Sequence, residues 1–62
     1  MIYNGYELKP NTDLTGVVLE NIDLTGIDLS GSDLRGSIFS NVDLSLANLS
    51  GTNLTGSNFD GV

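Results

Sequence analysis

The sequence contains no cysteine and no histidine, and only Lys9 and Arg35 are basic. Without cysteine the chain can form no disulfide and offers no thiolate to a metal ion or a redox reaction. Without histidine it lacks the side chain used most often as a general base. Eight acidic residues against two basic ones give a formal net charge of −6. This charge disfavours binding to nucleic-acid phosphates or to an anionic membrane surface.

Long apolar runs are also missing. No run approaches the length of a transmembrane helix, and residues 1–5 do not resemble a secretory signal, so we expect a cytoplasmic protein by default, although no residue identifies its compartment. A chain of 62 residues forms one domain at most and builds only a small core. Gly, Ser, Thr and Asn are plentiful, but their strict spacing argues against disorder.

What the chain does have is a leucine or phenylalanine at every fifth position from residue 14 to residue 59. Residues five apart on an α-helix point about 140° away from each other, and on a straight strand they lie on opposite faces. The pattern is satisfied if the chain turns once per repeat, because each central residue then points to a shared axis from a new side. We predict that these central residues form the structural core: Leu14, Leu19, Leu24, Leu29, Leu34, Phe39, Leu44, Leu49, Leu54 and Phe59.

The positions around each central residue follow the same period. Two residues before it the side chain is small or β-branched, and one residue before it the side chain is mostly Asp or Asn. Two residues after it stands Gly or Asn, which tolerate the positive φ that a type II turn requires. Each repeat is therefore predicted to be a short strand followed by a corner. Leu46 replaces the usual Gly, and because a bulky residue is strained at positive φ, we expect a different turn there.

These columns resemble the pentapeptide repeat family, whose consensus is roughly Ala-(Asp/Asn)-Leu-x-x. Residues 27–31 (IDLSG), 32–36 (SDLRG) and 47–51 (ANLSG) carry the resemblance most clearly. The resemblance implies an all-β fold, a right-handed quadrilateral β-helix with four repeats per coil and about three coils here. In the column two residues before the centre, only Ala47 is the favoured Ala. The bulkier residues at the other positions of this column imply a slightly swollen interior.

Four repeats per coil would place residues 20 apart above one another, and the exceptions to the columns recur at that spacing. An apolar residue replaces Asp or Asn twice, Asn replaces Gly twice, and Phe replaces Leu twice. The pairs are Val18 and Ile38, Asn21 and Asn41, and Phe39 and Phe59. The residues themselves thus favour a 20-residue coil, independently of the family.

Residues 1–62 are predicted to be a single domain with ten strict repeats over 12–61 and an irregular start over 1–11. Lys9 stands where a leucine is due. In one interpretation the register is shifted by one, so that Tyr3 and Leu8 are central residues of two repeats and one extra residue lies near Pro10. In the other, residues 1–11 form a capping strand whose Tyr6 and Leu8 cover the end of the coil. We favour the shifted register.

Outward-facing apolar residues are the candidate contact surface. Val18 and Ile38 should lie one above the other, about 4.8 Å apart at strand spacing. The predicted contact surface is Val18, Ile38 and Leu46. Scattered surface apolar residues are also normal in proteins that bind nothing there.

Stacked carboxylates are the nearest approach to a chemical site. Asp13 should lie beside Asp33, and Asp23 beside Asp43, and oxygen pairs of this kind attract hard cations. Two carboxylates without further ligands make a poor site, however, and no feature predicts a pocket around them. We therefore predict no catalytic residue, no metal and no cofactor, and expect that the protein is not an enzyme.

The function predicted is that of a structural or protein-interaction module, either a fragment of a longer chain or a component of a larger assembly such as a viral particle. Protein is the expected partner, including self-association through the C-terminal coil end; no nucleic acid, membrane or small molecule is expected. The alternative is an acidic DNA mimic acting on DNA gyrase, which the family resemblance implies for some members. Its weakness is length, because three coils rise only about 10–15 Å at strand spacing.

Overall fold

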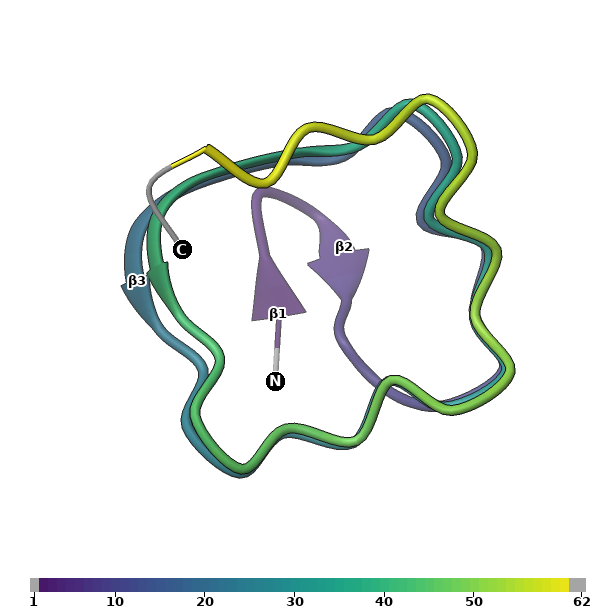
Figure 1. Ribbon diagram of the computed structural model, residues 1–62, viewed down its shortest axis with the longest axis horizontal. Coiled ribbons are helices and arrows are strands. Elements are labelled where there is room, and N and C mark those ends of the chain that lie inside the picture. The colour runs from purple at the N-terminus through teal and green to yellow at the C-terminus, as the bar shows by residue number, and fades with distance from the viewer. Residues whose placement is uncertain (1, 61–62) are drawn as a thin grey trace.

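A computed structural model describes residues 2–60 of the chain. The shifted register placed Met1 two residues before the centre Tyr3, and the last corner was predicted at Gly61. Both residues lie outside the described residues, as does Val62. Residues 2–60 contain only β-structure, with no helix. The four strands are β1 (Ile2–Tyr3), β2 (Tyr6–Glu7), β3 (Val18–Asp23) and β4 (Ile38–Asp43) (Figure 1).

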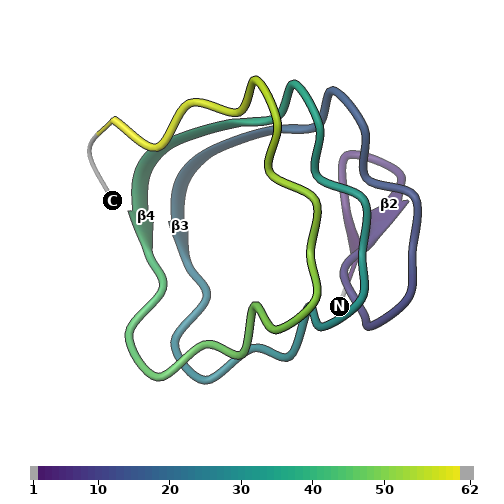
Figure 2. The same ribbon diagram turned by 45° about the vertical axis from the view of Figure 1, so that its right-hand side comes forward.

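Parallel pairing at one constant offset along the sequence organises the chain. Strand β3 pairs with β4 in a register that runs from Val18↔Ile38 to Asp23↔Asp43. Isolated parallel bridges outside the strands have the same offset: Asp13↔Asp33, Asp28↔Asn48, Asp33↔Asn53 and Ile38↔Asn58. Successive coils therefore lie over one another (Figures 1 and 2). At this offset residues 12–31 form the first coil, 32–51 the second, and 52–60 part of a third.

The central residues point into the coils and pack along the axis. The first six are fully or almost fully buried: Leu14, Leu19, Leu24, Leu29, Leu34 and Phe39. Leu44, Leu49 and Phe59 are partly buried against them. The rings of Phe39 and Phe59 stack with their centroids 4.5 Å apart, as the predicted coil length requires.

Leu54 corrects the prediction that all ten central residues are buried. Its exposed fraction is 38%, although Leu34, the equivalent residue of the preceding coil, is at 0%. Asp33 pairs with Asn53, so Leu34 has a coil on either side, whereas no coil of residues 2–60 follows Leu54. Burial of a central residue thus depends on a neighbouring coil as well as on its own repeat.

Serines in the column two before the centre also point inward. Ser32 and Ser37 have exposed fractions of 1% and 0%. The Ser37 hydroxyl donates to the Leu34 carbonyl at 2.7 Å, and the Ser32 hydroxyl donates to the Lys9 carbonyl at 3.1 Å. Both inward hydroxyls are thus hydrogen-bonded to the backbone, which removes the penalty of burying them.

The N-terminal residues correct the shifted register. Strands β1 and β2 pair antiparallel, with Tyr3 opposite Tyr6, whereas repeats would pair parallel with a coil. The turn between them has positive φ at both Asn4 (48°) and Gly5 (81°), which is typical of a type I′ hairpin. Leu8, rather than Lys9, is buried.

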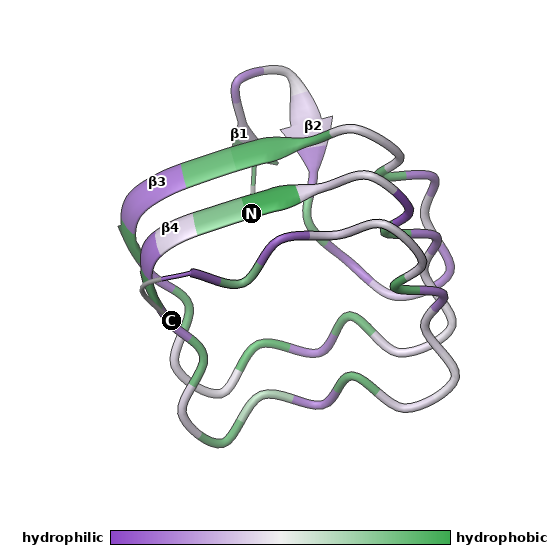
Figure 3. Ribbon diagram, turned by 45° about the horizontal axis from the view of Figure 1, so that its top comes forward, coloured by the Kyte–Doolittle hydropathy of each residue, from purple (hydrophilic) through white to green (hydrophobic). Residues whose placement is uncertain are grey.

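The β1–β2 hairpin lies across one end of the stack, inside the outline of the coil in Figure 1 and beyond β3 in Figure 3. The Tyr3 hydroxyl lies 3.3 Å from the Glu20 carbonyl oxygen and donates to it. The coil register begins at Asn11, whose N–H donates to the Ser30 carbonyl at 2.9 Å. Asn11 has the positive φ of a corner, at 57°. The buried Leu8 lies six positions before Leu14, one more than the repeat period, so the predicted extra residue near Pro10 is present.

Candidate functional site

The outward column has a structural task in each of the eight repeats where Asp or Asn occupies it. Each side chain accepts, through Oδ1, a hydrogen bond from the N–H two residues later, over distances of 2.9–3.1 Å. Such Asx turns hold the chain at the start of a corner. The residues are Asp13, Asp23, Asp28, Asp33, Asp43, Asn48, Asn53 and Asn58, which we call the cap column. The Asx turns were not predicted from the sequence, although Asp or Asn three residues before Gly is a turn signal.

Hydrogen bonding keeps the stacked carboxylates ionised. The hydroxyls of Thr25 and Ser45 donate to Asp23 and Asp43 at 2.6 Å each. Bonds from these side chains, and then from the backbone, hold the pKa of each carboxyl below its ordinary value. Burial, and for Asp23 the charge of Asp43, act in the opposite direction, but the net pKa of both carboxyls is lowered.

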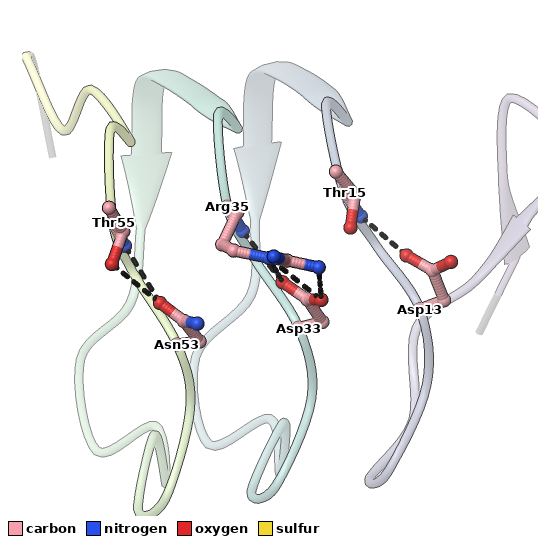
Figure 4. Close-up of polar contacts among 6 residues, drawn as sticks. All are labelled: Asp13, Thr15, Asp33, Arg35, Asn53 and Thr55. Atoms are coloured by element: carbon pink, nitrogen blue, oxygen red, sulfur yellow. Dashed lines mark hydrogen bonds and ion pairs between the residues drawn. The ribbon is translucent and has the colours of Figure 1, made fainter.

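In the second stacked pair, Asp13 and Asp33, Arg35 forms an ion pair with Asp33. Its guanidinium donates to both Asp33 oxygens, with Nη2 at 2.7 Å from Oδ2 (Figure 4). This hydrogen bonding is the largest cause of the lowered pKa of Asp33. The pKa of Asp13 is lowered first by hydrogen bonds from Thr15 and, to a smaller extent, by the charge of Arg35. No group of three or more potential metal ligands of the His, Cys, Asp or Glu type occurs within residues 2–60.

The structure brings together two of the three residues of the predicted contact surface. Val18 and Ile38 are direct partners in the β3–β4 register, with exposed fractions of 40% and 41%. Leu46 lies outside that sheet and has an exposed fraction of 90%. The apolar area shared by Val18 and Ile38 is therefore small.

The expected change of turn at Leu46 is wrong. Leu46 has a φ of 61°, as the Gly corners do, and the Ala47 N–H bonds to the Leu44 carbonyl at 3.0 Å. The equivalent bond from Val17 to Leu14 is 3.1 Å. Leucine is not branched at Cβ, and its outward side chain meets nothing that forces another turn, so backbone pairing between the coils determines the conformation.

Unpaired backbone groups line the outer side of residues 41–60. Inside the stack, central N–H groups donate to the following coil, as Leu34 does to Asn53 at 2.9 Å. Later central N–H groups and the carbonyls between them have no backbone partner within residues 2–60. We call this row the open edge: the N–H groups of Leu44, Leu49 and Leu54 and the carbonyls of Ala47, Thr52 and Ser57.

Comparison with known families explains this geometry. A family model described as pentapeptide repeats matches the chain with eight copies, over residues 12–51 and 27–62. The chain belongs to the pentapeptide repeat family. Neither the curated proteins nor the solved structures yielded a match to this pentapeptide repeat protein.

In this pentapeptide repeat protein, surfaces and edges are the candidate functional features. The described residues enclose no pocket. Nor does that part of the chain contain a helix long and apolar enough to cross a membrane. The two surfaces to weigh are the lateral Val18–Ile38 pair and the open edge.

Proposed function

We propose that this pentapeptide repeat protein is a non-enzymatic structural or interaction module that binds protein through its open edge. The observation that carries the proposal is the row of unpaired N–H and C=O groups along residues 44–57. An exposed strand edge is a template for pairing with another polypeptide. The β1–β2 hairpin crosses the opposite end of the stack, where the Tyr3 hydroxyl donates to the Glu20 carbonyl.

The proposal includes the detailed fold. Family membership and the constant offset between paired coils support a right-handed quadrilateral β-helix with four repeats per coil. The expected three coils then become about two and a half, because the hairpin replaces the first repeats. In such a solid rod, binding is confined to its outer faces and its ends.

Burial at the open edge supplies the energy of association. Leu54 is 38% exposed there, and Leu44, Leu49 and Phe59 are only partly buried. Covering them adds a hydrophobic term to backbone hydrogen bonds that contribute about 0.5–1.5 kcal/mol each. For the isolated chain the partner at hand is a second copy; in a larger assembly, such as a viral particle, it is a neighbouring subunit.

Sedimentation velocity over a range of micromolar concentrations tests the proposal. We expect a mass that rises above the 6.5 kDa of one chain. Leu54→Lys places a charge at the open edge and should abolish the association. Val18→Lys is the matched control, because Val18 is apolar and exposed to nearly the same extent, at 40% against 38%, but lies on a lateral face. Circular dichroism checks that both variants fold.

Three results would overturn the proposal. A strictly monomeric wild-type chain at high concentration would show that the edge does not pair. Association that survives Leu54→Lys would place the interface elsewhere. Association lost in Val18→Lys would assign it to the lateral face that contains Val18 and Ile38.

The net charge of −6 is the observation that favours the second candidate, a DNA mimic acting on gyrase. The dimensions of the molecule weaken it. Its longest extent is 22 Å, which corresponds to about six base pairs at 3.4 Å each. A supercoiling assay in which gyrase activity falls with added protein would support the mimic, and unchanged activity at high concentration would discard it.

A further inference from the structure

The asparagines of this chain differ in the residue that follows each one. In the coils the repeat places a larger side chain there, because a central residue follows the cap column and an inward β-branched residue follows the corner asparagines. Those following residues are Thr12, Ile22, Val42, Leu49, Leu54 and Phe59. Asn4 is the one asparagine of the sequence that precedes a glycine, and it lies in the β1–β2 hairpin, outside the repeat.

An asparagine side chain can react with the backbone of the residue that follows it. The backbone nitrogen attacks Cγ and closes a succinimide ring, and the side-chain nitrogen leaves as ammonia with the proton of the backbone N–H. Water then opens the ring at either carbonyl, which gives aspartate or isoaspartate. A side chain on the following residue hinders the attack, and a β-branched one is both bulky and stiff. Gly5 has no side chain, so Asn4 is the least hindered asparagine.

We infer that Asn4 is the site at which this protein deamidates, and that the isoaspartate formed there opens the β1–β2 hairpin. Asn4 and Gly5 are both exposed, so water reaches the ring that they form. The Gly5 N–H has no hydrogen-bond partner among residues 2–60, so no bond holds the attacking nitrogen in place. The three asparagines of the cap column differ, because Asx bonds of 2.9–3.1 Å hold their side chains.

The folded hairpin controls the rate of this reaction. In a type I′ turn the first central residue has ψ near about +30°, and the succinimide ring holds ψ far from that value, so the turn must open before the ring closes. Each strand has only two residues, and a short two-stranded hairpin is marginally stable in water. The Tyr3 hydroxyl, 3.3 Å from the Glu20 carbonyl oxygen, ties the hairpin to the first coil and limits this opening.

The two products affect the hairpin differently. Aspartate leaves the main chain unchanged and tolerates the positive φ of the turn. Isoaspartate routes the main chain through the former side chain and lengthens the turn by one carbon, so the pairing of Tyr3 with Tyr6 is lost. Both tyrosines pack against the core, next to Leu8, which has an exposed fraction of 3%. Isoaspartate at residue 4 therefore uncovers this end of the core, whereas aspartate does not.

Incubation of the full chain in mildly alkaline buffer tests the inference. Ion-exchange chromatography separates the forms that have gained a negative charge, and tandem mass spectrometry of peptides assigns the residue. In Asn4→Gly the amide is absent, and Gly-Gly also fits a type I′ turn. Asn21→Gly is the matched control, because Asn21 is exposed with a positive φ of 53°, as Asn4 is with 48°, but precedes Ile22. Circular dichroism and the urea midpoint check that both variants fold.

We expect the first acidic form to be modified at Asn4, and its rate of formation to fall at least about tenfold in Asn4→Gly and to stay within about twofold in Asn21→Gly. Peptide mapping separates it from isomerisation at Asp60, which also precedes a glycine but gains no charge. A first modification at another asparagine, or an unchanged rate in Asn4→Gly, would overturn the site.

The effect on the hairpin has a test of its own. The isolated isoaspartyl form should unfold at a lower urea midpoint than freshly prepared Asn4→Asp, which has the same charge and an ordinary main chain. Equal midpoints would overturn the claim that isoaspartate opens the hairpin.

Discussion

Replacing Leu34 by alanine should remove a large part of the stability of this protein. Leu34 is completely buried, and the pairing of Asp33 with both Asp13 and Asn53 places it between two coils. Leucine-to-alanine changes in protein cores cost about 2–5 kcal/mol, and the cost is highest where the site cannot collapse. Here backbone bonds of 2.8–3.2 Å hold the neighbouring coils in place, so we expect about 4 kcal/mol.

The consequence for folding is large because the domain is small. A chain of 62 residues has a free energy of unfolding of about 3–9 kcal/mol at typical values per residue. Urea denaturation followed by circular dichroism measures the loss as a lower midpoint with an unchanged slope. Leu54→Ala is the control: Leu54 is 38% exposed and has a described coil on one side only, so its loss should be roughly 1–2 kcal/mol.

Equal losses at the two positions, or a loss below about 1 kcal/mol at Leu34, would refute the reasoning. Either result would mean that the stack relaxes around a missing side chain, and that the coils are less rigidly connected than their hydrogen bonds indicate. Both variants are compared with the wild type at one protein concentration, because association through the open edge would otherwise contribute to the difference.

Three further outcomes are expected from urea denaturation. Gly31→Val should lower the free energy of unfolding by about 1–3 kcal/mol because of its positive φ, and further because the new side chain collides with that of Asn11. Gly26→Val has open space around it and should cost only the backbone strain. Equal losses would mean that the Asn11 side chain moves aside freely. Leu46→Gly should raise the free energy of unfolding by roughly 0.5–1.5 kcal/mol, because it relieves the backbone strain of a positive φ and removes only an exposed side chain. A clear loss of stability would show that Leu46 packs against the fold. Hydrogen bonds from Ser30 hold the pKa of Asp28 below the ordinary 3.8. The contribution of the Asp28 carboxylate to stability is therefore complete above pH 3.8 and is lost as the pH falls through the lowered pKa. The urea midpoint should drop on acidification, by less in Asp28→Asn, and an equal drop in that variant would contradict this assignment.

The all-β class and the register between coils could be predicted from the sequence because both follow from columns of side chains. A shared inward direction requires leucine at a fixed period, and the rarer replacements, such as Val18 and Ile38, show which repeats lie side by side. Positions that depend on what lies beyond a repeat could not be predicted in this way. Leu54 has the same local sequence pattern as Leu34, and only the coil that follows distinguishes their burial.

Local turn chemistry explains the other differences. Asn4-Gly5 is a strong hairpin signal, but counting every fifth residue gave more weight to Tyr3 and Leu8 as repeat centres. Leu46 was expected to avoid positive φ because of its own preference, yet hydrogen bonding between coils overrides that preference by holding its neighbours. At the candidate site, the lateral pair was predictable from spacing, and self-association through the C-terminal coil end was also predicted. Only the hydrogen bonds between coils, however, identify the unpaired backbone groups of the open edge.

The constant offset between paired coils also determines the order in which this chain can fold as it leaves the ribosome. The β1–β2 hairpin joins residues that lie within 2–7, so a nascent chain can form it almost at once. The first bond between coils joins Asn11 to Ser30, and until residue 30 has emerged the first coil has no backbone partner. The leucines of the first coil stay exposed to water while the second coil is being synthesised. Each later residue then pairs with a coil that is already in place.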